Sequence, residues 1–346
     1  MNNATGLTPA LRILLLVAAA AVALWGMSNY ASYINSAMLA VLIVLACGPI
    51  IDRLRPKVPK WAVLLIALAV SLVALVLFLL FLVYATAEFA RTLPTYKGQA
   101  QAMVQNLQAW LQGMGLDEAG AQAVATQADP SASLDWAHGL LSAFGSALGS
   151  GVTLALIMVF LFVDVVLFPG RLAWQGLHRS AYAQRLAGYA IDLRQYLVVM
   201  VIIGAAVGAA NTVFFYLTGV PMPLLWGVLS GLLNFIPFIG FWFGLIPPVL
   251  LTLLAHGPER MLLVAAGYIL INATVQNVIQ PRLVVSRLNL TPLMSLLSST
   301  FWPLVLGPVG AIIGVPLTMS VRSLLLDADP STRWLADMMC TTIPEE

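Results

Sequence analysis

Apolar residues run along this chain in blocks long enough to cross a lipid bilayer, and short polar or charged stretches separate the blocks. The blocks occupy residues 11–27, 37–51, 61–87, 151–168, 197–217 and 261–279. A membrane-crossing helix needs about 20 mostly apolar residues, because the hydrocarbon core is about 30 Å thick and a helix rises about 1.5 Å per residue. The pattern therefore predicts an all-α, polytopic transmembrane protein.

The first two blocks are interpreted as a pair of retained helices. A short polar start with one positive charge, Arg12, before an alanine-rich apolar stretch is also typical of a cleaved signal peptide. The apolar pattern resumes at residue 37, however, after the uncharged residues 28–36. This early resumption favours two helices joined by an uncharged turn.

Positive charges set the orientation of the blocks. The loop 52–60 carries four of them, at Arg53, Arg55, Lys57 and Lys60. Loops rich in Lys and Arg stay on the cytoplasmic side of a membrane, so this loop is expected to be cytoplasmic. A second basic stretch follows the fourth block and contains Arg171, Arg179, Arg185 and Arg194. Its apolar residues are spaced as on a helix lying along the inner surface.

Residues 88–149 differ from the blocks around them, because they are rich in Gln, Ala, Gly and Ser and contain no window apolar enough to span. Apolar residues recur at helical spacing in 96–114 and in 134–148. We expect amphipathic helices that form a small extracytoplasmic insert. Mutual packing of these helices into a cap is the simpler interpretation, and a dedicated ligand-binding module is the alternative.

Two later apolar segments, residues 224–255 and 291–321, are too long for one crossing and are interrupted. The interruption of the first contains Asn234, Pro237 and Gly240. That of the second contains Pro303, Gly307, Pro308 and Gly310. Each segment is either a long kinked helix that crosses once or a re-entrant hairpin of two half-helices that enters and leaves on the same side.

The charge pattern favours the hairpins. If each segment crosses once, Arg282 and Arg287 fall outside, whereas with hairpins both arginines lie inside, as the positive-inside rule prefers. Non-helical backbone in a membrane is tolerated only inside protein or beside a water-filled cavity. Two such broken segments therefore indicate a transport site near the middle of the membrane, where half-helix ends can bind an ion or a polar solute.

Amide side chains near the end of the sixth block are candidates for this site. They are Asn272, Gln276, Asn277 and Gln280. Residues four apart share a helix face, so three of these amides are positioned to hydrogen-bond a solute. They would serve equally well to hold neighbouring helices together.

Asp164 is the only carboxylate well inside an apolar block. A charge in the membrane needs a partner or a water-filled cavity, so proton or cation coupling is one hypothesis. Pairing with an arginine near the inner end of the block, such as Arg171, is the alternative.

Composition excludes several classes of protein. Only 16 basic and 14 acidic side chains occur among 346 residues, and 61% of the residues are hydrophobic. A soluble domain of this size could not cover its surface with so few charges, and a net charge of +2 gives no footprint for nucleic acid. No phosphate-binding loop, metal-ligand spacing or catalytic pairing occurs, so we expect no catalytic residues, no cofactor and no metal. Cys47 and Cys340 give no disulfide framework.

Five short motifs in the last third of the chain resemble a known family in order and spacing. They are LNFIPFIG at 233–240, QNVIQPR at 276–282, LNLTP at 288–292, LGPVG at 306–310 and GVPLT at 314–318. The chain resembles the autoinducer-2 exporter family of bacterial membrane proteins at these motifs. The layout of the preceding spans, basic loop, insert and Asp164 is also similar to that family.

The resemblance implies a multi-pass permease of the bacterial inner (cytoplasmic) membrane that exports autoinducer-2, a small polar quorum-sensing molecule. Other members are linked to sodium–proton exchange, and members form homo-oligomers, with pentamers described. Relatives often carry an acidic residue before the Pro-Arg pair, where this chain has Gln280. This departure weakens the case for cation coupling there and leaves Asp164 as the main intramembrane acid.

These observations divide the chain into five parts. We expect N-terminal transmembrane helices in 1–87, the extracytoplasmic insert in 88–149, transmembrane helices with a cytoplasmic surface helix in 150–220, the transport core in 221–325 and a cytoplasmic tail in 326–346. The favoured hypothesis is secondary or facilitated export of a small polar solute through the core. A cation–proton antiporter that uses Asp164, and a non-transporting membrane scaffold whose insert binds partners, are the alternatives.

Overall fold

The computed structural model describes residues 8–114, 117–127, 139, 151–167, 181–280, 290–327 and 332–339. Every regular element within these residues is a helix. Four of the described helices are long and apolar enough to cross a membrane, and a fifth span arises if a sharply bent pair near the N-terminus counts as one crossing. The predicted polytopic all-α membrane fold is therefore confirmed.

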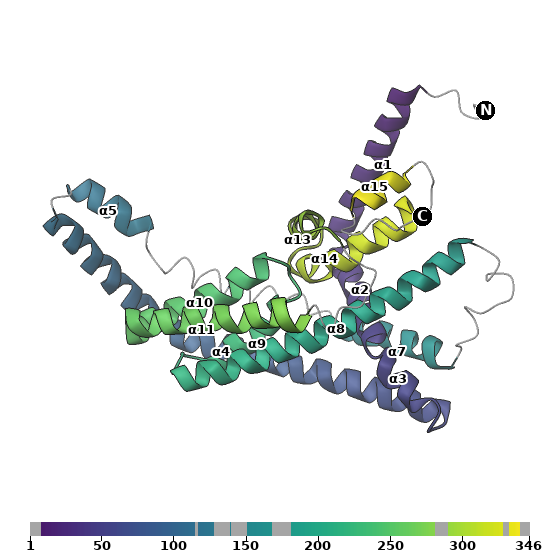
Figure 1. The fold of residues 1–346 in the computed structure, drawn as a ribbon, viewed down its shortest axis with the longest axis horizontal. Coiled ribbons are helices and arrows are strands. Elements are labelled where there is room, and N and C mark those ends of the chain that lie inside the picture. The colour runs from purple at the N-terminus through teal and green to yellow at the C-terminus, as the bar shows by residue number, and fades with distance from the viewer. Residues whose placement is uncertain are drawn as a thin grey trace.

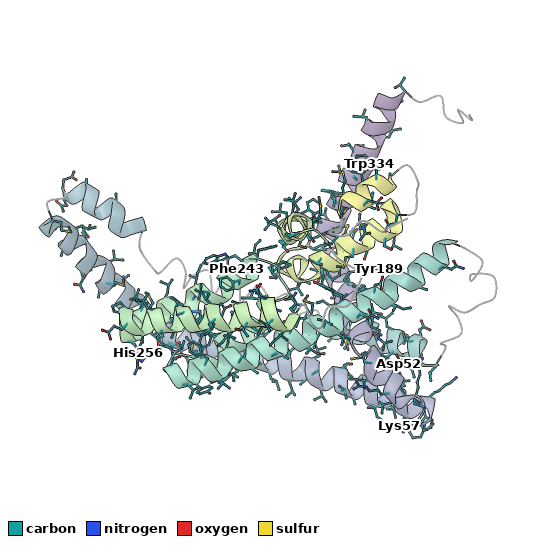
Figure 2. The ribbon with its side chains drawn as sticks, in the orientation of Figure 1. Asp52, Lys57, Tyr189, Phe243, His256 and Trp334 are labelled. Atoms are coloured by element: carbon teal, nitrogen blue, oxygen red, sulfur yellow. The ribbon has the colours of Figure 1, made fainter. Side chains whose placement is uncertain are left out.

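The long apolar helices share one general direction. They are α4 (Lys60–Gly113), α8 (Ala181–Thr218), α10 (Ile239–His256) and α11 (Pro258–Thr274). Figure 1 shows all four running along the long axis of the molecule. Asp52 and Lys57 lie toward one end of this axis, which we call the basic end, and His256 lies toward the other (Figure 2).

The N-terminal pair bends at a single residue. Helix α1 (Pro9–Asn29) and helix α2 (Ala31–Ala46) meet at Tyr30 with an angle of 86°. The turn expected over residues 28–36 is shortened to this one residue, because no Gly or Pro interrupts the stretch and its polar side chains bond within the helices. The Asn29 amide donates to the Trp25 carbonyl, and the Ser36 hydroxyl donates to the Ser32 carbonyl.

The basic end ties three helices together. Helix α3 (Gly48–Leu54) carries Asp52, whose Oδ2 lies 2.6 Å from Nη2 of Arg194 on α8. The guanidinium of Arg55, which follows α3, donates to the carbonyl of Val165 on α7 (Gly151–Leu167) at 2.7 Å. These contacts join the basic loop to the C-terminal part of the fourth apolar block and to the stretch of α8 just before the fifth.

Helix α4 is longer than the expected third span. It continues without a break from Lys60 to Gly113, about 80 Å, although the span was expected to end at residue 87. The second half of α4 contains one proline, Pro94. A single proline removes only one backbone hydrogen-bond donor, so the helix continues past it. The second half of α4 and helix α5 (Glu118–Gln127) project beyond the bundle at the end remote from the basic loop (Figure 1).

Parts of the expected insert and surface helix lie outside the described residues. These parts are most of 128–150 and all of 168–180. Residues 181–196, which were expected in a separate surface helix, extend the fifth span as one continuous helix, α8. No proline interrupts this stretch, and the ion pair between Arg194 and Asp52 holds it at the basic end.

Both interrupted segments are antiparallel helical hairpins. The first consists of α9 (Pro223–Leu233) and α10, and a Cβ added at Gly244 of α10 would lie 3.4 Å from Cβ of Ser230 on α9. The α9 half is only about 16 Å long, too short to cross the membrane core of about 30 Å. We call this pair the first hairpin.

The second hairpin pairs α13 (Pro292–Leu306) with α14 (Pro308–Val321). The indole of Trp302 donates to the Thr318 hydroxyl at 2.8 Å, and this hydroxyl donates to Ser298 at 2.8 Å. A Cβ added at Gly310 would collide with the Trp302 carbonyl, and one at Gly314 would lie 3.1 Å from the Ser298 carbonyl oxygen, so the two helices run in opposite directions. A π-turn (Arg322–Leu326) and the short helix α15 (Arg333–Met338) follow.

Glycines let α8 and α9 approach to backbone contact. A Cβ added at Gly204 would lie 2.8 Å from the Gly231 carbonyl oxygen, and one at Gly208 would lie 3.3 Å from the Gly227 carbonyl oxygen. Small residues four apart are a common device for close packing of membrane helices. The contact fixes the first hairpin on α8.

We expect Gly204→Ala to destabilise the protein by about 1–3 kcal/mol, because the added methyl group overpacks the contact between α8 and α9. Gly188→Ala is the matched control on the same helix, since nothing lies within 4 Å of its added Cβ. That control should be neutral or slightly stabilising, because Ala favours a helix over Gly. Thermal unfolding of the detergent-solubilised protein measures both, and equal destabilisation would contradict the packing.

Candidate functional site

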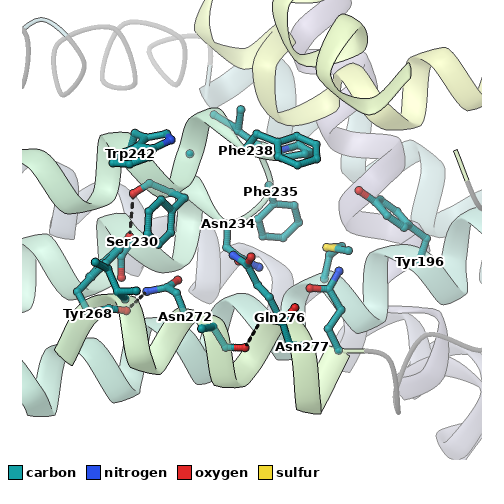
Figure 3. Close-up of a pocket in the computed structure, with 18 residues that line it drawn as sticks. Tyr196, Ser230, Asn234, Phe235, Phe238, Trp242, Tyr268, Asn272, Gln276 and Asn277 are labelled. Carbon is teal, nitrogen blue, oxygen red and sulfur yellow. Dashed lines mark hydrogen bonds between the residues drawn. The ribbon is translucent and has the colours of Figure 1, made fainter. Parts of the chain in front are cut away.

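A pocket of about 460 Å³ lies between the break of the first hairpin, α11 and α8. Asn234 in the break, Tyr196 on α8 and the amides of α11 contribute to its wall, as Figure 3 shows. Its lining consists of Tyr196, Met200, Ser230, Asn234, Phe235, Ile236, Pro237, Phe238, Gly240, Phe241, Trp242, Tyr268, Ile269, Asn272, Ala273, Gln276, Asn277 and Gln280. None of these side chains is charged.

The break between α9 and α10 forms one wall of the pocket and contains a tight turn. The Ile239 amide donates to the Pro237 carbonyl at 2.6 Å, which closes a three-residue turn around Phe238. Phe238 has φ 60° and ψ −57°, a γ-turn geometry that is rare and strained for a residue with a side chain. Strained backbone of this kind is concentrated at functional sites.

Gly240 is required where the chain leaves this turn. A Cβ at this position would collide with the Leu233 carbonyl at the end of α9. The Gly240 amide donates to the Ile236 carbonyl at 3.0 Å, which starts α10. Asn234, Pro237 and Gly240 therefore have distinct local roles: the first presents an amide to the pocket, the second interrupts the helix, and the third allows it to fold back.

The opposite wall comes from the end of α11, where the helix widens into a π-turn (Val275–Ile279). The Gln280 amide N–H donates to the Val275 carbonyl five residues earlier. Gln276 and Asn277 both line the pocket, and together with Ala273 and Gln280 they keep the three- and four-residue spacing of a single helix face through this turn.

Hydrogen bonds within the protein orient part of this wall. The Asn272 amide donates to the Tyr268 carbonyl at 2.9 Å, and the Asn277 amide donates to the Ala273 carbonyl at 2.9 Å (Figure 3). The oxygen of Asn277 is therefore the part of that side chain left to accept a hydrogen bond from a solute.

Ser230 is held from behind by a buried residue of α8. The Asn211 amide donates to the Ser230 hydroxyl at 3.0 Å, and this hydroxyl donates to the Gly227 carbonyl at 2.7 Å. Since the hydroxyl proton is engaged, Ser230 presents only a lone pair to the pocket. The Asn211 Oδ1 atom is buried and has no hydrogen-bond partner within the described part of the chain.

The structure brings seven of the eleven expected pathway residues to this one pocket. They are Asn234, Pro237, Gly240, Asn272, Gln276, Asn277 and Gln280. The other four, Pro303, Gly307, Pro308 and Gly310, belong to the second hairpin and do not line it. Trp302 and Leu306 of that hairpin pack instead against side chains of α1 and α2. The Asn35 amide on α2 donates to the Leu306 carbonyl at 2.9 Å.

The charged candidates lie away from the pocket. Asp164 is on α7, which contributes no residue to the lining, and its side chain is exposed. Arg53, Arg55, Lys57 and Lys60 lie in and after α3 at the basic end. Arg282 and Arg287 lie outside the described residues, as does Cys340. Within the described part of the chain, no three His, Cys, Asp or Glu residues could hold a metal ion together.

Several pocket residues were missed by reasoning from the sequence. Ser230 and Tyr268 lie one helical turn before Asn234 and Asn272, so the four-residue spacing could have identified both. The aromatic side chains of the break, Phe235, Phe238 and Trp242, are within or next to its motif. Tyr196 and Met200 on α8 gave no local signal, because they meet the pocket only through tertiary packing.

Comparisons with known proteins point to one family. The sequence model of the protein family described as "AI-2E family transporter" matches residues 13–328 of this chain. The chain is 32% identical to the AI-2 transport protein TqsA of Escherichia coli (strain K12), over 90% of this chain and 91% of that protein. It is 30% identical to a Haemophilus influenzae protein named "Putative transport protein", over 93% and 94% of the two chains.

The strained turn gives a stability test with two variants of Phe238. Both Phe238→Gly and Phe238→Ala remove the ring, but only glycine adopts a positive φ freely. Relief of about 1–3 kcal/mol of strain should outweigh the extra chain entropy of glycine, about 0.5–1 kcal/mol. We therefore expect the glycine variant to unfold at the higher temperature of the two. A more stable alanine variant would contradict the turn geometry.

Proposed function

The chain belongs to the AI-2E family of transporters, and we propose that it moves a small, uncharged polar solute across the bacterial inner membrane through the pocket beneath the first hairpin. It is a multi-pass membrane protein, and its family is one of transporters. The observation that carries the proposal is the pocket itself. Five side-chain amides and a broken helix meet there, and no charged side chain lines it.

The chemistry of the wall supports a neutral solute with several hydroxyl groups. Side-chain amides both donate and accept hydrogen bonds, so they suit hydroxyl groups, which do the same. A solute with a net charge would lose its hydration without gaining an ionic partner, and this desolvation costs several kcal/mol. Phe235, Phe238 and Trp242 add apolar faces for the carbon skeleton. The volume of about 460 Å³ is within the usual range for small-molecule sites.

We propose autoinducer-2 as the solute and export as the direction. The name of the E. coli relative states AI-2 transport, and the neutral pocket is compatible with a small polar molecule of that kind. The proposal of export follows the resemblance to the exporter family. Homo-oligomeric assembly is proposed on the same basis.

Movement of the first hairpin is the proposed means of transport. Its break is strained at Phe238, and backbone strain of this kind is found in segments that switch between two arrangements. The second hairpin is fastened to α2 through Asn35 and Leu306, which makes it part of the frame. The sequence contains no phosphate-binding loop of the kind that nucleotide-driven motors use. We therefore propose secondary or facilitated transport.

The main prediction concerns the amide of Gln276. We expect Gln276→Leu to lower transport of autoinducer-2 by about tenfold or more, because the solute loses a hydrogen-bond partner and faces an apolar group instead. Flux into or out of proteoliposomes containing purified protein measures the effect. Gln105→Leu, the same change on an exposed part of α4, is the matched control and should leave transport unchanged. Equal flux in wild type and Gln276→Leu would contradict the proposal.

The antiporter and scaffold alternatives make different predictions. If the solute passes through the neutral pocket, Asp164→Asn should leave autoinducer-2 flux unchanged, because Asp164 lies on α7 and outside the lining. A pH-sensitive dye inside the vesicles tests the antiporter directly. Proton movement on addition of sodium that disappears in Asp164→Asn would favour cation–proton antiport. A scaffold would keep its function in Gln276→Leu and lose it when residues 88–149 are deleted.

A further inference from the structure

A second hollow of different chemistry lies on the other side of α8. Two adjoining cavities of about 900 Å³ and about 260 Å³ share six lining residues: Ile43, Leu75, Phe78, Val201, Leu232 and Phe235. Together they form one continuous space between α2 and α4 on one side and α8 and α9 on the other. We call it the lateral groove.

The lateral groove offers nothing to a polar ligand. Its larger cavity contains three side chains with polar atoms, and each is already bonded within the protein. The sulfur of Cys47 lies 3.2 Å from the Ser71 hydroxyl, which donates to the Ala67 carbonyl at 2.8 Å. The Thr212 hydroxyl donates to the Gly208 carbonyl at 2.7 Å. An occupant of this groove must therefore be apolar along its length.

The groove is long, and its rim is open. Along α8 it extends from Leu197 to Val213, about 24 Å, which exceeds the thickness of one membrane leaflet, about 15 Å. Val70, Val201 and Val213 on its rim are each between 46% and 59% exposed. Ala205 and Ala209 leave space between α4 and α9 that a larger side chain would fill. These dimensions suit a single hydrocarbon chain that enters from the side.

One end of the groove is basic. Arg194 lies one turn before Leu197 on α8, and its guanidinium packs against Gly48, the neighbour of the groove residue Cys47. One of its five N–H groups points to Asp52, which leaves others for a second acceptor. Arg53, Arg55 and Lys57 are exposed close by in sequence, and Asp52 is the only acidic residue of the loop 52–60.

We propose that the lateral groove binds an anionic phospholipid, with one acyl chain between α4 and α9 and the headgroup phosphate at Arg194. The groove supplies apolar surface without unsatisfied polar groups, and the basic end supplies the complementary charge. Basic sites between membrane helices on the cytoplasmic side are suited to anionic headgroups. Lipid binding in this groove does not depend on which solute the protein transports.

A lipid in the lateral groove would contact residues that also form the wall of the pocket beneath the first hairpin. Phe235 lines both the lateral groove and the pocket beneath the first hairpin. On α8, Tyr196 and Met200 face the pocket while the next residues along, Leu197 and Val201, face the groove. An acyl chain in the groove therefore packs against the same part of the first hairpin whose other side contacts the solute.

Native mass spectrometry of the purified full chain tests whether an acyl chain occupies the groove. The probes are phosphatidylglycerol and phosphatidylcholine with identical acyl chains. We expect the wild type to retain phosphatidylglycerol in preference to phosphatidylcholine. Ala205→Phe should lower retention by about tenfold or more, because its ring fills the groove. Ala206→Phe is the matched control, since Ala206 is the next residue on α8, is exposed and does not line the groove.

The headgroup contact is tested with Arg194→Gln. We expect about fivefold weaker binding of phosphatidylglycerol and unchanged binding of phosphatidylcholine, the effect of one basic residue near an anionic lipid. Asp52→Asn breaks the same ion pair but keeps the arginine, so it should retain the preference. Loss of the preference in both variants would show a structural role of the pair and overturn the assignment of the phosphate to Arg194.

Three results would overturn the lipid site as a whole. The first is full retention of phosphatidylglycerol by Ala205→Phe, and the second is equal retention of both lipids by the wild type. The third is a change of oligomer mass in Ala205→Phe, because this would identify the groove as a contact between copies of the chain. Thermal unfolding of each variant separates loss of lipid from loss of fold. Ala209→Phe, one turn further along the groove, gives a second blocking variant if Ala205→Phe is unstable.

Discussion

Lipid cannot satisfy the backbone N–H and C=O groups at a helix end, and this structure has two breaks that place helix ends within apolar segments. In the first hairpin the chain satisfies them locally, through short-range bonds to the carbonyls of Leu232, Leu233 and Ile236. In the second, short-range bonds to the carbonyls of Pro303 and Gly307 are joined by a distant side chain, the Asn35 amide at the Leu306 carbonyl. The first break therefore faces a pocket, whereas the second is also hydrogen-bonded to α2.

Much of the architecture follows from the spacing of apolar blocks and from the position of a few charges. Arg282 and Arg287 favoured hairpins over single crossings, and each interrupted segment is an antiparallel helix pair, in which α9 is too short to cross and α10 is long enough. The cluster of amides around Gln276 lines one pocket with Asn234, as its position in two neighbouring motifs suggested. These features were predictable because helix length and loop charge are local properties that the bilayer converts into topology.

The remaining features depend on which helices meet, and no local pattern specifies that. The bend at Tyr30 and the continuity of α4 through residue 87 occur where the sequence has no strong start or stop signal. The π-turn at Val275–Ile279 is a local widening that apolar periodicity does not indicate. The separation of the two breaks was likewise unpredictable, since Gly307 and Gly240 occur in similar motifs but have different neighbours.

The bond between Asn35 and Leu306 joins residues 271 positions apart, and this has a consequence for how the chain is made. Translation places α2 in the membrane long before α13 exists, so Asn35 enters the bilayer without the carbonyl that later accepts its proton. Its Oδ1 atom has no partner within the described residues even in the finished fold. Helix α2 can pack against α4 and α7 as soon as these helices are made, as it does in the finished fold. Its hydrogen bond to the second hairpin forms only when the last third of the protein arrives. The packing around Asn35 is therefore completed by the end of the chain and not by its neighbours in sequence.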